Sequence, residues 1–107
     1  MFNYLHYTYR VTWSQEDNEF VGLCVEFPSI SFLETSPDKA LKGIISLVHE
    51  VLEDLNANDE KIPVPLSHKP YSGKFQVRIT SEQHRHLAIE AAEQKVSLNR
   101  YVASKLI

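Results

Sequence analysis

The amino-acid sequence predicts an α+β fold built from two modules, an N-terminal antiparallel sheet with one long packed helix and a C-terminal strand-helix-helix segment. Three observations predict it: an apolar/polar alternation near the start, a wide apolar stripe at helical spacing in the middle, and a second short alternation followed by two helix-start signals. We place the first module at residues 1–66, a linker at 67–73 and the second module at 74–107.

The start of the first module is predicted to form three strands. From Leu5 to Trp13 apolar and polar residues alternate, which is typical of a half-buried strand. A polar turn at residues 14–19 and an apolar run from Phe20 to Phe27 indicate a hairpin. Pro28 ends the second strand because proline cannot donate to a sheet ladder. Residues 30–34 are expected to form a third, short strand.

A long helix is predicted at about residues 37–55. Ser36, Pro37 and Asp38 give a helix start, with a hydroxyl at the N-cap, a proline at the first helical position and an acid in the first turn. The apolar positions that follow recur at helical spacing and are Leu41, Ile44, Ile45, Val48, Val51, Leu52 and Leu55. This stripe predicts that the helix lies across the sheet.

The C-terminal module follows a proline-rich stretch at residues 56–72, in which residues 62–66 could add an edge strand to the first module. Residues 74–79 alternate polar and apolar without exception, which predicts a strand. Residues 80–83, Thr-Ser-Glu-Gln, predict a capping box at the start of a helix. Ser97 is expected to cap a second helix. The predicted order is therefore strand, helix, helix.

This C-terminal segment is too small to fold alone, since a chain usually needs about 40 residues to bury enough surface. Its single strand would leave both edges unpaired, and the same strand of a second copy would pair with it in antiparallel fashion. The predicted product is a homodimer in which a two-stranded ribbon packs on four helices. We expect its dimer core to contain Phe75, Val77, Ile79, Leu87, Tyr101 and Val102.

In such a ribbon Lys74, Gln76 and Arg78 would face outward. Lysine and arginine can donate to guanine, glutamine can pair with adenine, and a two-stranded ribbon fits the major groove of DNA. The backbone N–H groups that open the second helix suit a phosphate, and Arg100 could add a charge-assisted contact. The expected phosphate-contacting residues are Ser97, Leu98, Asn99 and Arg100. A solvated edge strand would also explain the alternation alone, but the following helix pair favours the ribbon.

Charge is distributed unevenly along the chain. Residues 1–70 hold five Lys and Arg against eleven Asp and Glu, a formal net charge of −6, whereas residues 71–107 hold six against three, a net charge of +3. An acidic first module can attract a basic protein, and a basic second module can attract a phosphate backbone. This asymmetry agrees with two binding modules but decides little by itself.

Several functional classes are not expected. No stretch approaches the roughly 20 apolar residues that span a bilayer, and the first residues have no basic segment followed by an apolar run, so we expect a cytoplasmic protein that does not enter membranes. Cys24 lies among apolar residues, which indicates a buried hydrophobic side chain rather than a nucleophile.

Catalysis and metal binding are not expected either. Three glycines, at positions 22, 43 and 73, leave no glycine-rich phosphate loop. His49-Glu50 begins like a zinc-protease helix, but Glu53 stands where the second histidine belongs. His6 and His68 have no acidic or cysteine partner at ligand spacing. We therefore expect no enzyme, no cofactor and no metal site.

The C-terminal residues resemble a known family. The run from Lys74 to Thr80, followed by Leu87-Ala88, Ala91 and Ser97-Leu98-Asn99, resembles the ribbon-helix-helix domain of the Arc/MetJ class as it occurs fused to HicB-type antitoxins. Residues 9–14, 25–28 and 36–41 follow the HicB order of strands and helix more loosely, so the resemblance covers nearly the whole chain. It implies that Lys74, Gln76 and Arg78 read bases and that Ser97, Leu98 and Asn99 clamp a phosphate.

The resemblance also implies a function. A HicB-like first module would cap a HicA-type toxin, a small basic RNA-cleaving protein, and the C-terminal domain would repress the operon as a dimer or a higher assembly such as a tetramer. The sequence departs from the family pattern where glycines are usual, near Asn18, Ser29 and Leu33, and at Lys95, where the family tends to place a left-handed glycine. A lysine in that conformation costs about 1 kcal/mol.

Two other functions fit the same residues. The chain could be a stand-alone transcriptional regulator whose N-terminal domain senses a small molecule or holds dimers together; a toxin gene beside this one would separate that reading from the antitoxin. It could also be a structural or metabolic-partner protein whose C-terminal strand pairs with something else and never meets DNA. Loss of operator binding on Arg78→Ala would exclude this last reading.

Overall fold

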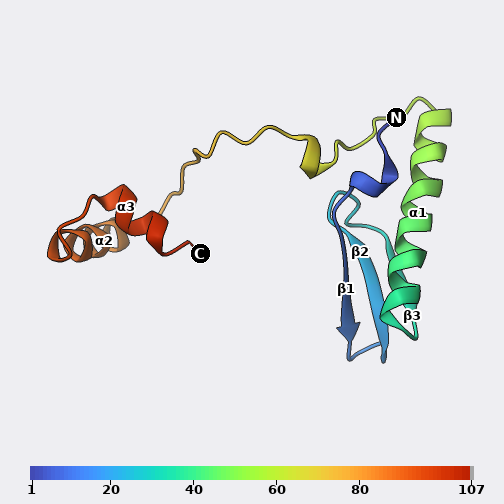
Figure 1. Ribbon diagram of the computed structural model, residues 1–107, viewed down its shortest axis with the longest axis horizontal. Helices are drawn as coiled ribbons and strands as arrows, with labels where there is room; N and C mark the ends of the chain where they lie inside the picture. Colours follow the sequence, from blue (N-terminus) through green and yellow to red (C-terminus); the bar gives the residue numbers. More distant parts are fainter. Residues whose placement is uncertain (107) are drawn as a thin grey trace. The chain divides into compact units, whose positions relative to one another are not determined.

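The computed structural model describes residues 1–106 and divides into two compact units, Met1–Tyr71 (unit 1) and Ser72–Ile107 (unit 2). Unit 1 contains a three-stranded sheet and the helix α1, and unit 2 contains α2 and α3 (Figure 1). The predicted α+β class is thereby confirmed. Within the described residues, no helix is long and apolar enough to cross a membrane.

The sheet is an antiparallel meander of β1 (Tyr9–Ser14), β2 (Glu19–Cys24) and β3 (Ser31–Glu34). The strands lie in the order β1-β2-β3, with Val11 opposite Gly22 and Gly22 opposite Phe32. The predicted hairpin is confirmed. Its turn places Asn18 at φ 53°, a left-handed conformation that asparagine tolerates better than most residues, so this turn forms without a glycine.

Two predicted strand boundaries were wrong, and one possible edge strand is not formed. The first strand begins at Tyr9 rather than Leu5, because the Asn3 side chain accepts the Leu5 amide at 2.9 Å and holds Tyr4–His6 in a 3-10 turn, η1. The second strand ends at Cys24, because a turn follows in which the Phe27 amide donates to the carbonyl of Cys24. No edge strand forms at residues 62–66, where Pro63 and Pro65 have no N–H to donate.

The helix α1 (Pro37–Ala57) packs on one face of the sheet (Figure 1). It begins as predicted, with the Ser36 hydroxyl accepting the Lys39 amide, and it ends two residues later than expected. Its end is a Schellman motif, in which Asp59 takes φ 53° and the Glu60 amide donates to the Leu55 carbonyl at 2.9 Å.

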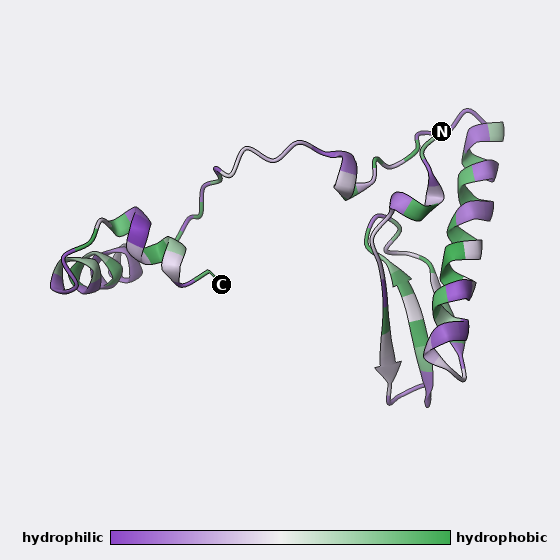
Figure 2. Cartoon of the chain, in the orientation of Figure 1, coloured by the Kyte–Doolittle hydropathy of each residue, from purple (hydrophilic) through white to green (hydrophobic). Residues whose placement is uncertain are grey.

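The core of unit 1 lies between α1 and the sheet. Its buried cluster comprises Tyr7, Cys24, Phe27, Ile44, Val48 and Leu52. Figure 2 shows β2 as a mostly hydrophobic strand, whereas α1 alternates hydrophobic and hydrophilic stretches. The strand and the helix come so close that a Cβ atom added to Gly22 would lie 2.5 Å from the Ala40 carbonyl oxygen. The prediction that Cys24 is buried is confirmed, and this burial raises the pKa of its thiol to about 11.

Unit 1 extends beyond residue 66 because side chains hold the following stretch in place. The Tyr7 hydroxyl donates to the Pro63 carbonyl at 2.6 Å, and the Leu66 amide donates to the Glu26 carboxylate at 2.9 Å. Residues Leu66–His68 then form a second 3-10 turn, η2. Part of the stretch that we assigned to the linker therefore belongs to the first compact unit.

Unit 2 contains the two predicted helices, α2 (Ser81–Glu93) and α3 (Leu98–Ser104). The capping box is confirmed, since the Gln83 amide donates to the Thr80 hydroxyl while the Gln83 side chain accepts the Thr80 amide. The two helices are joined through Lys95, which takes φ 59° in a second Schellman motif where the Val96 amide donates to the Ala91 carbonyl at 3.1 Å.

Candidate nucleic-acid interface

The segment before α2 exposes a row of large apolar side chains. Phe75 is 74% exposed, Val77 68% and Ile79 45%. Residues 74–80 form neither helix nor strand within the described part of this single chain, and all of them are exposed. A strand needs a hydrogen-bonded neighbour, so the pairing of this segment with a second copy stays a prediction.

The same apolar side chains border a groove of about 630 Å³ within unit 2. Phe75, Val77 and Ile79 line it from the segment, and Leu87, Leu98 and Val102 line it from α2 and α3. Gln76 and Arg78 are not among the lining residues. The apolar residues of the alternating pattern thus line the groove, together with Lys74, whereas Gln76 and Arg78 do not.

The three expected base-reading residues are all exposed to solvent. Among residues 1–106, neither Lys74 nor Arg78 takes part in a salt bridge. Lys74 differs from the other two because it also borders the groove. Gln76 and Arg78 are thus exposed outside the groove, and base reading by the three residues stays a prediction.

The expected phosphate-contacting residues do not form one uniform surface. The Ser97 hydroxyl accepts the Arg100 amide at 3.1 Å, so the serine side chain satisfies one of the free N–H groups at the start of α3. Leu98 is half-buried and lines the groove together with Asn99. Arg100 is exposed and its side chain takes part in no salt bridge in the described range. Phosphate contact by these residues stays a prediction.

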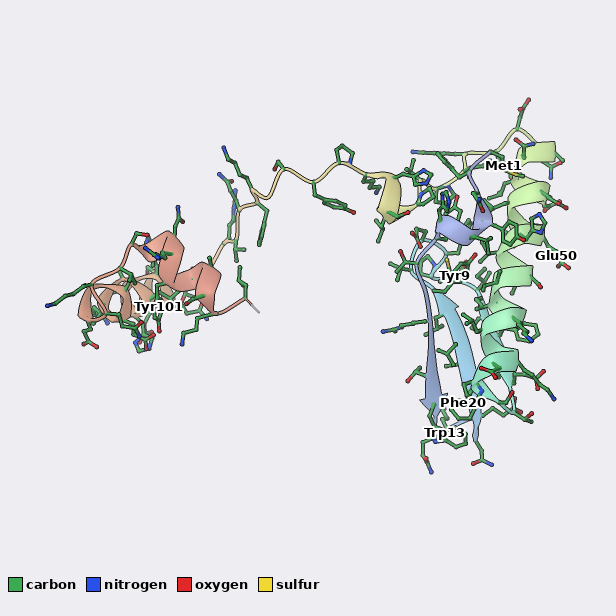
Figure 3. All side chains as sticks on the ribbon, viewed as in Figure 1. Met1, Tyr9, Trp13, Phe20, Glu50 and Tyr101 are labelled. Atoms are coloured by element: carbon green, nitrogen blue, oxygen red, sulfur yellow. The ribbon has the colours of Figure 1, made fainter. Side chains whose placement is uncertain are left out.

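Tyr101, labelled in Figure 3, is the one expected core residue that is already buried within a single chain. Its hydroxyl donates to the carboxylate of Glu90 on α2, which lowers the pKa of Glu90 and raises that of Tyr101. The same carboxylate lies 2.8 Å from His86 Nε2. Tyr101 therefore joins α2 to α3, whereas Leu87 and Val102 are half-buried and the three segment residues remain exposed.

Sequence reasoning did not single out two residues that the structure brings into this region. Glu90 is the acceptor that joins α2 to α3, and its signal was the four-residue spacing from His86 on a helix. Ile89 is an exposed apolar residue that lines a second groove of about 530 Å³ with Ile79 and Leu87. The sequence feature that could have identified Ile89 is its position next to Leu87 and Ala88, which belong to the apolar face of α2.

Comparison with known proteins bears on this same part of the chain. A family model described as the HicB family matches residues 57–106, which include the exposed segment, α2 and α3. No curated protein and no solved structure matches the chain. The family match favours an antitoxin-like role in a toxin-antitoxin system, in a family that is generally not enzymatic. It supports a HicB-type identity for this chain.

Proposed function

We propose that this protein is a HicB-type antitoxin that binds operator DNA as a dimer through residues 74–79 and neutralises an RNA-cleaving toxin through unit 1. The observation that carries the DNA-binding part is the two-faced segment of unit 2. Its apolar side chains are exposed and border a groove of unit 2, and Gln76 and Arg78 are exposed and do not line that groove. Two copies paired along this segment would form the ribbon of a ribbon-helix-helix domain, as the sequence resemblance implies.

The energetics of the exposed residues support a dimer. Full burial of a fully exposed Phe, Val or Ile side chain stabilises by about 1.5–3 kcal/mol, so the six such side chains of two copies, which are already partly buried, would contribute at most roughly 9–18 kcal/mol. Association itself costs about 4–15 kcal/mol in lost freedom of motion. Antiparallel pairing would in addition satisfy the backbone N–H and C=O groups along one edge of each segment.

A paired ribbon would present two copies each of Lys74, Gln76 and Arg78 to the major groove. The net charge of +3 over residues 71–107 favours approach to a phosphate backbone, and Arg100 would contribute a contact to it. Ser97, Leu98 and Asn99 would take part through their backbone rather than their side chains, since the Ser97 hydroxyl accepts the Arg100 amide and Leu98 and Asn99 line the groove.

Operator binding can be tested with single arginine variants and fluorescence anisotropy on the DNA of the chain's own promoter. Arg78→Ala should lose about 1–3 kcal/mol on this DNA with folding intact, because it removes a base contact. Arg100→Ala should weaken specific and non-specific DNA alike and reduce the salt slope by about one. Arg85→Ala, in which an exposed arginine is removed from α2, is the matched control. Unchanged operator affinity in Arg78→Ala would refute base reading by this segment.

Toxin neutralisation rests on the family match and on the net charge of −6 over residues 1–70, which suits a basic partner. Adding this protein in excess to a purified HicA-type toxin should abolish RNA cleavage. Arg78→Ala should inhibit as well as the unmodified chain, because the substitution lies outside unit 1. Undiminished cleavage in the presence of excess protein would count against this half of the proposal and leave the DNA-binding half standing.

A further inference from the structure

Two histidines that lie 62 residues apart in sequence meet on the surface of unit 1. His6 Nδ1 lies 2.8 Å from His68 Nε2, and the two rings approach edge to face with centroids 5.0 Å apart. His6 is the last residue of η1 and His68 the last residue of η2. Both side chains are exposed, so a solvated ion can reach the paired nitrogens.

The pair is held in place by contacts that do not use the two facing nitrogens. The Ser67 hydroxyl donates to the His6 carbonyl at 2.7 Å, which fixes η2 against η1. The Phe2 and His68 rings pack edge to face, with centroids 5.6 Å apart. The Leu66 amide donates to Glu26. The backbone positions of both histidines are thus set before any ligand binds.

The two facing nitrogens lie 2.8 Å apart, which is the length of the hydrogen bond between the rings. With metal–nitrogen bonds of about 2.0 Å, two ligands at a right angle lie about 2.8 Å apart, whereas two ligands of a tetrahedral ion lie about 3.3 Å apart. The exposed side chains therefore need the smaller change in nitrogen separation to bind a tetragonal ion. Imidazole is a suitable ligand for Cu²⁺ and Ni²⁺, and these ions favour tetragonal coordination.

We propose that His6 Nδ1 and His68 Nε2 form a two-histidine binding site for a divalent transition-metal ion that prefers tetragonal coordination. Cu²⁺ is the ion that we expect to bind most tightly. Among residues 1–106 no group of three or more His, Cys, Asp or Glu side chains could hold a metal, so water fills the remaining positions. The ion takes the place of the hydrogen bond between the rings: the shared proton leaves the donor nitrogen and that ring takes up a proton from solvent on its other nitrogen, so both imidazoles bind in the neutral form with no net loss of protons. Binding clamps η2 to η1 near the end of unit 1, independently of the proposed function.

The test is a titration of the full-length protein with CuCl₂ alone, followed by calorimetry and electron paramagnetic resonance. We expect one Cu²⁺ per chain at this site, with two coordinated imidazole nitrogens in the spectrum. His6→Ala and His68→Ala should each retain one of these nitrogens, and each should weaken binding by at least about tenfold. His49→Ala is the matched control: this histidine belongs to the same unit but contacts Glu53 at 3.1 Å. Its affinity for Cu²⁺ should equal that of the unmodified chain.

Other outcomes overturn the site. Unmodified affinity in both His6→Ala and His68→Ala, or an equal loss in His49→Ala, would show that the ion binds elsewhere. Zn²⁺ binding more tightly than Cu²⁺ at these histidines would refute the tetragonal geometry. Circular dichroism checks that the alanine variants fold. If His68→Ala does not fold, His68→Gln replaces it, because glutamine keeps a polar side chain but removes the imidazole. Unchanged Cu²⁺ binding by His68→Gln would also refute the site.

Discussion

Unit 1 and unit 2 both contain a short alternating segment, but only the segment of unit 1 finds a neighbour within the chain. Strand β1 pairs along its whole length with β2, and the core beneath includes Ile44, Val48 and Leu52 at full burial. The corresponding segment of unit 2, residues 74–79, has no neighbouring strand and leaves its apolar side chains in solvent. The comparison shows that alternation predicts which side chains share a face of the segment, whereas a strand forms only when a second strand lies beside it. Unit 1 supplies that partner itself, and unit 2 does not.

The largest effect is expected when a charge is placed on the apolar face of the unit 2 segment. Val77→Asp should weaken dimerisation by about 3–6 kcal/mol, roughly 10²- to 10⁴-fold in the dissociation constant, because two copies each lose a buried side chain. Analytical ultracentrifugation measures this. Gln76→Asp puts the same charge on the opposite face and should leave the dimer intact while weakening DNA binding. Equal dimerisation of Val77→Asp and the unmodified chain would break the comparison between the two units.

The next effect concerns the close contact inside unit 1. A Cβ atom at Gly22 would lie 2.5 Å from the Ala40 carbonyl oxygen and 2.8 Å from Ile44 Cγ2, so Gly22→Ala should destabilise unit 1 by about 1–3 kcal/mol. Urea unfolding followed by Trp13 fluorescence reports on this unit. Dimerisation through unit 2 should persist below the new unfolding transition. A simultaneous loss of the dimer would show that the two units are not independent.

A smaller, pH-dependent effect is expected at Glu26. Burial opposes ionisation of this carboxyl, but the Leu66 and Thr8 amides and the Thr8 hydroxyl donate to it, and together they lower its pKa below 4.5. Glu26→Gln should cost unit 1 about 1–2 kcal/mol at neutral pH.

The sign of this pH dependence follows from the depressed pKa. The stabilisation by Glu26 is fully present above the unfolded value near 4.5 and is lost as the pH falls through the lower folded value. The difference in the free energy of unfolding between the unmodified chain and Glu26→Gln, measured by urea titration, should therefore become smaller as the pH falls. Glu16→Gln, on an exposed turn, is the control. If this difference in the free energy of unfolding stays constant across the pH range, the effect comes from the shape of the Glu26 side chain and not from its charge.

The smallest effect should stabilise unit 2. Lys95→Gly relieves about 1 kcal/mol of left-handed strain at φ 59°, partly offset by the greater freedom of glycine in the unfolded chain, for a net gain of roughly 0.5 kcal/mol. Gln94→Gly is the matched control, because Gln94 has φ −86° and its replacement should destabilise. Thermal unfolding at one fixed protein concentration compares the two. A loss of stability in Lys95→Gly would show that the lysine side chain contributes more than its backbone strain costs.

Features that depend on a few neighbouring residues could be predicted from the sequence. The Ser36 helix start and the Thr80–Gln83 capping box depend on a few consecutive residues, and the structure confirms both. The left-handed conformation of Lys95 was implied by the family resemblance, and the structure confirms it as well. Among the described residues no strand lies beside the segment 74–79, so neither the sequence pattern nor a single folded copy reveals whether it pairs.

Features that depend on distant residues could not be predicted. From the alternation alone, the first strand was expected to begin at Leu5. It begins at Tyr9, because a hydrogen bond from the Leu5 amide to the Asn3 side chain holds the preceding residues in a 3-10 turn. The need for glycine at position 22 comes from Ala40 on α1. The contact between His6 and His68 could not be predicted either, because 62 residues separate them in the sequence.

The meander of unit 1 has a consequence for synthesis of the protein. Each strand pairs with the next one in sequence, and α1 follows directly, so all the contacts of this unit join residues that leave the ribosome within the first 71 positions. Local pairing of this kind favours fast folding, and translation proceeds at about 5–20 residues per second. Unit 1 can thus fold as soon as its 71 residues are free of the ribosome, without a second chain. The proposed ribbon of unit 2 differs, because it would form only when two finished copies meet.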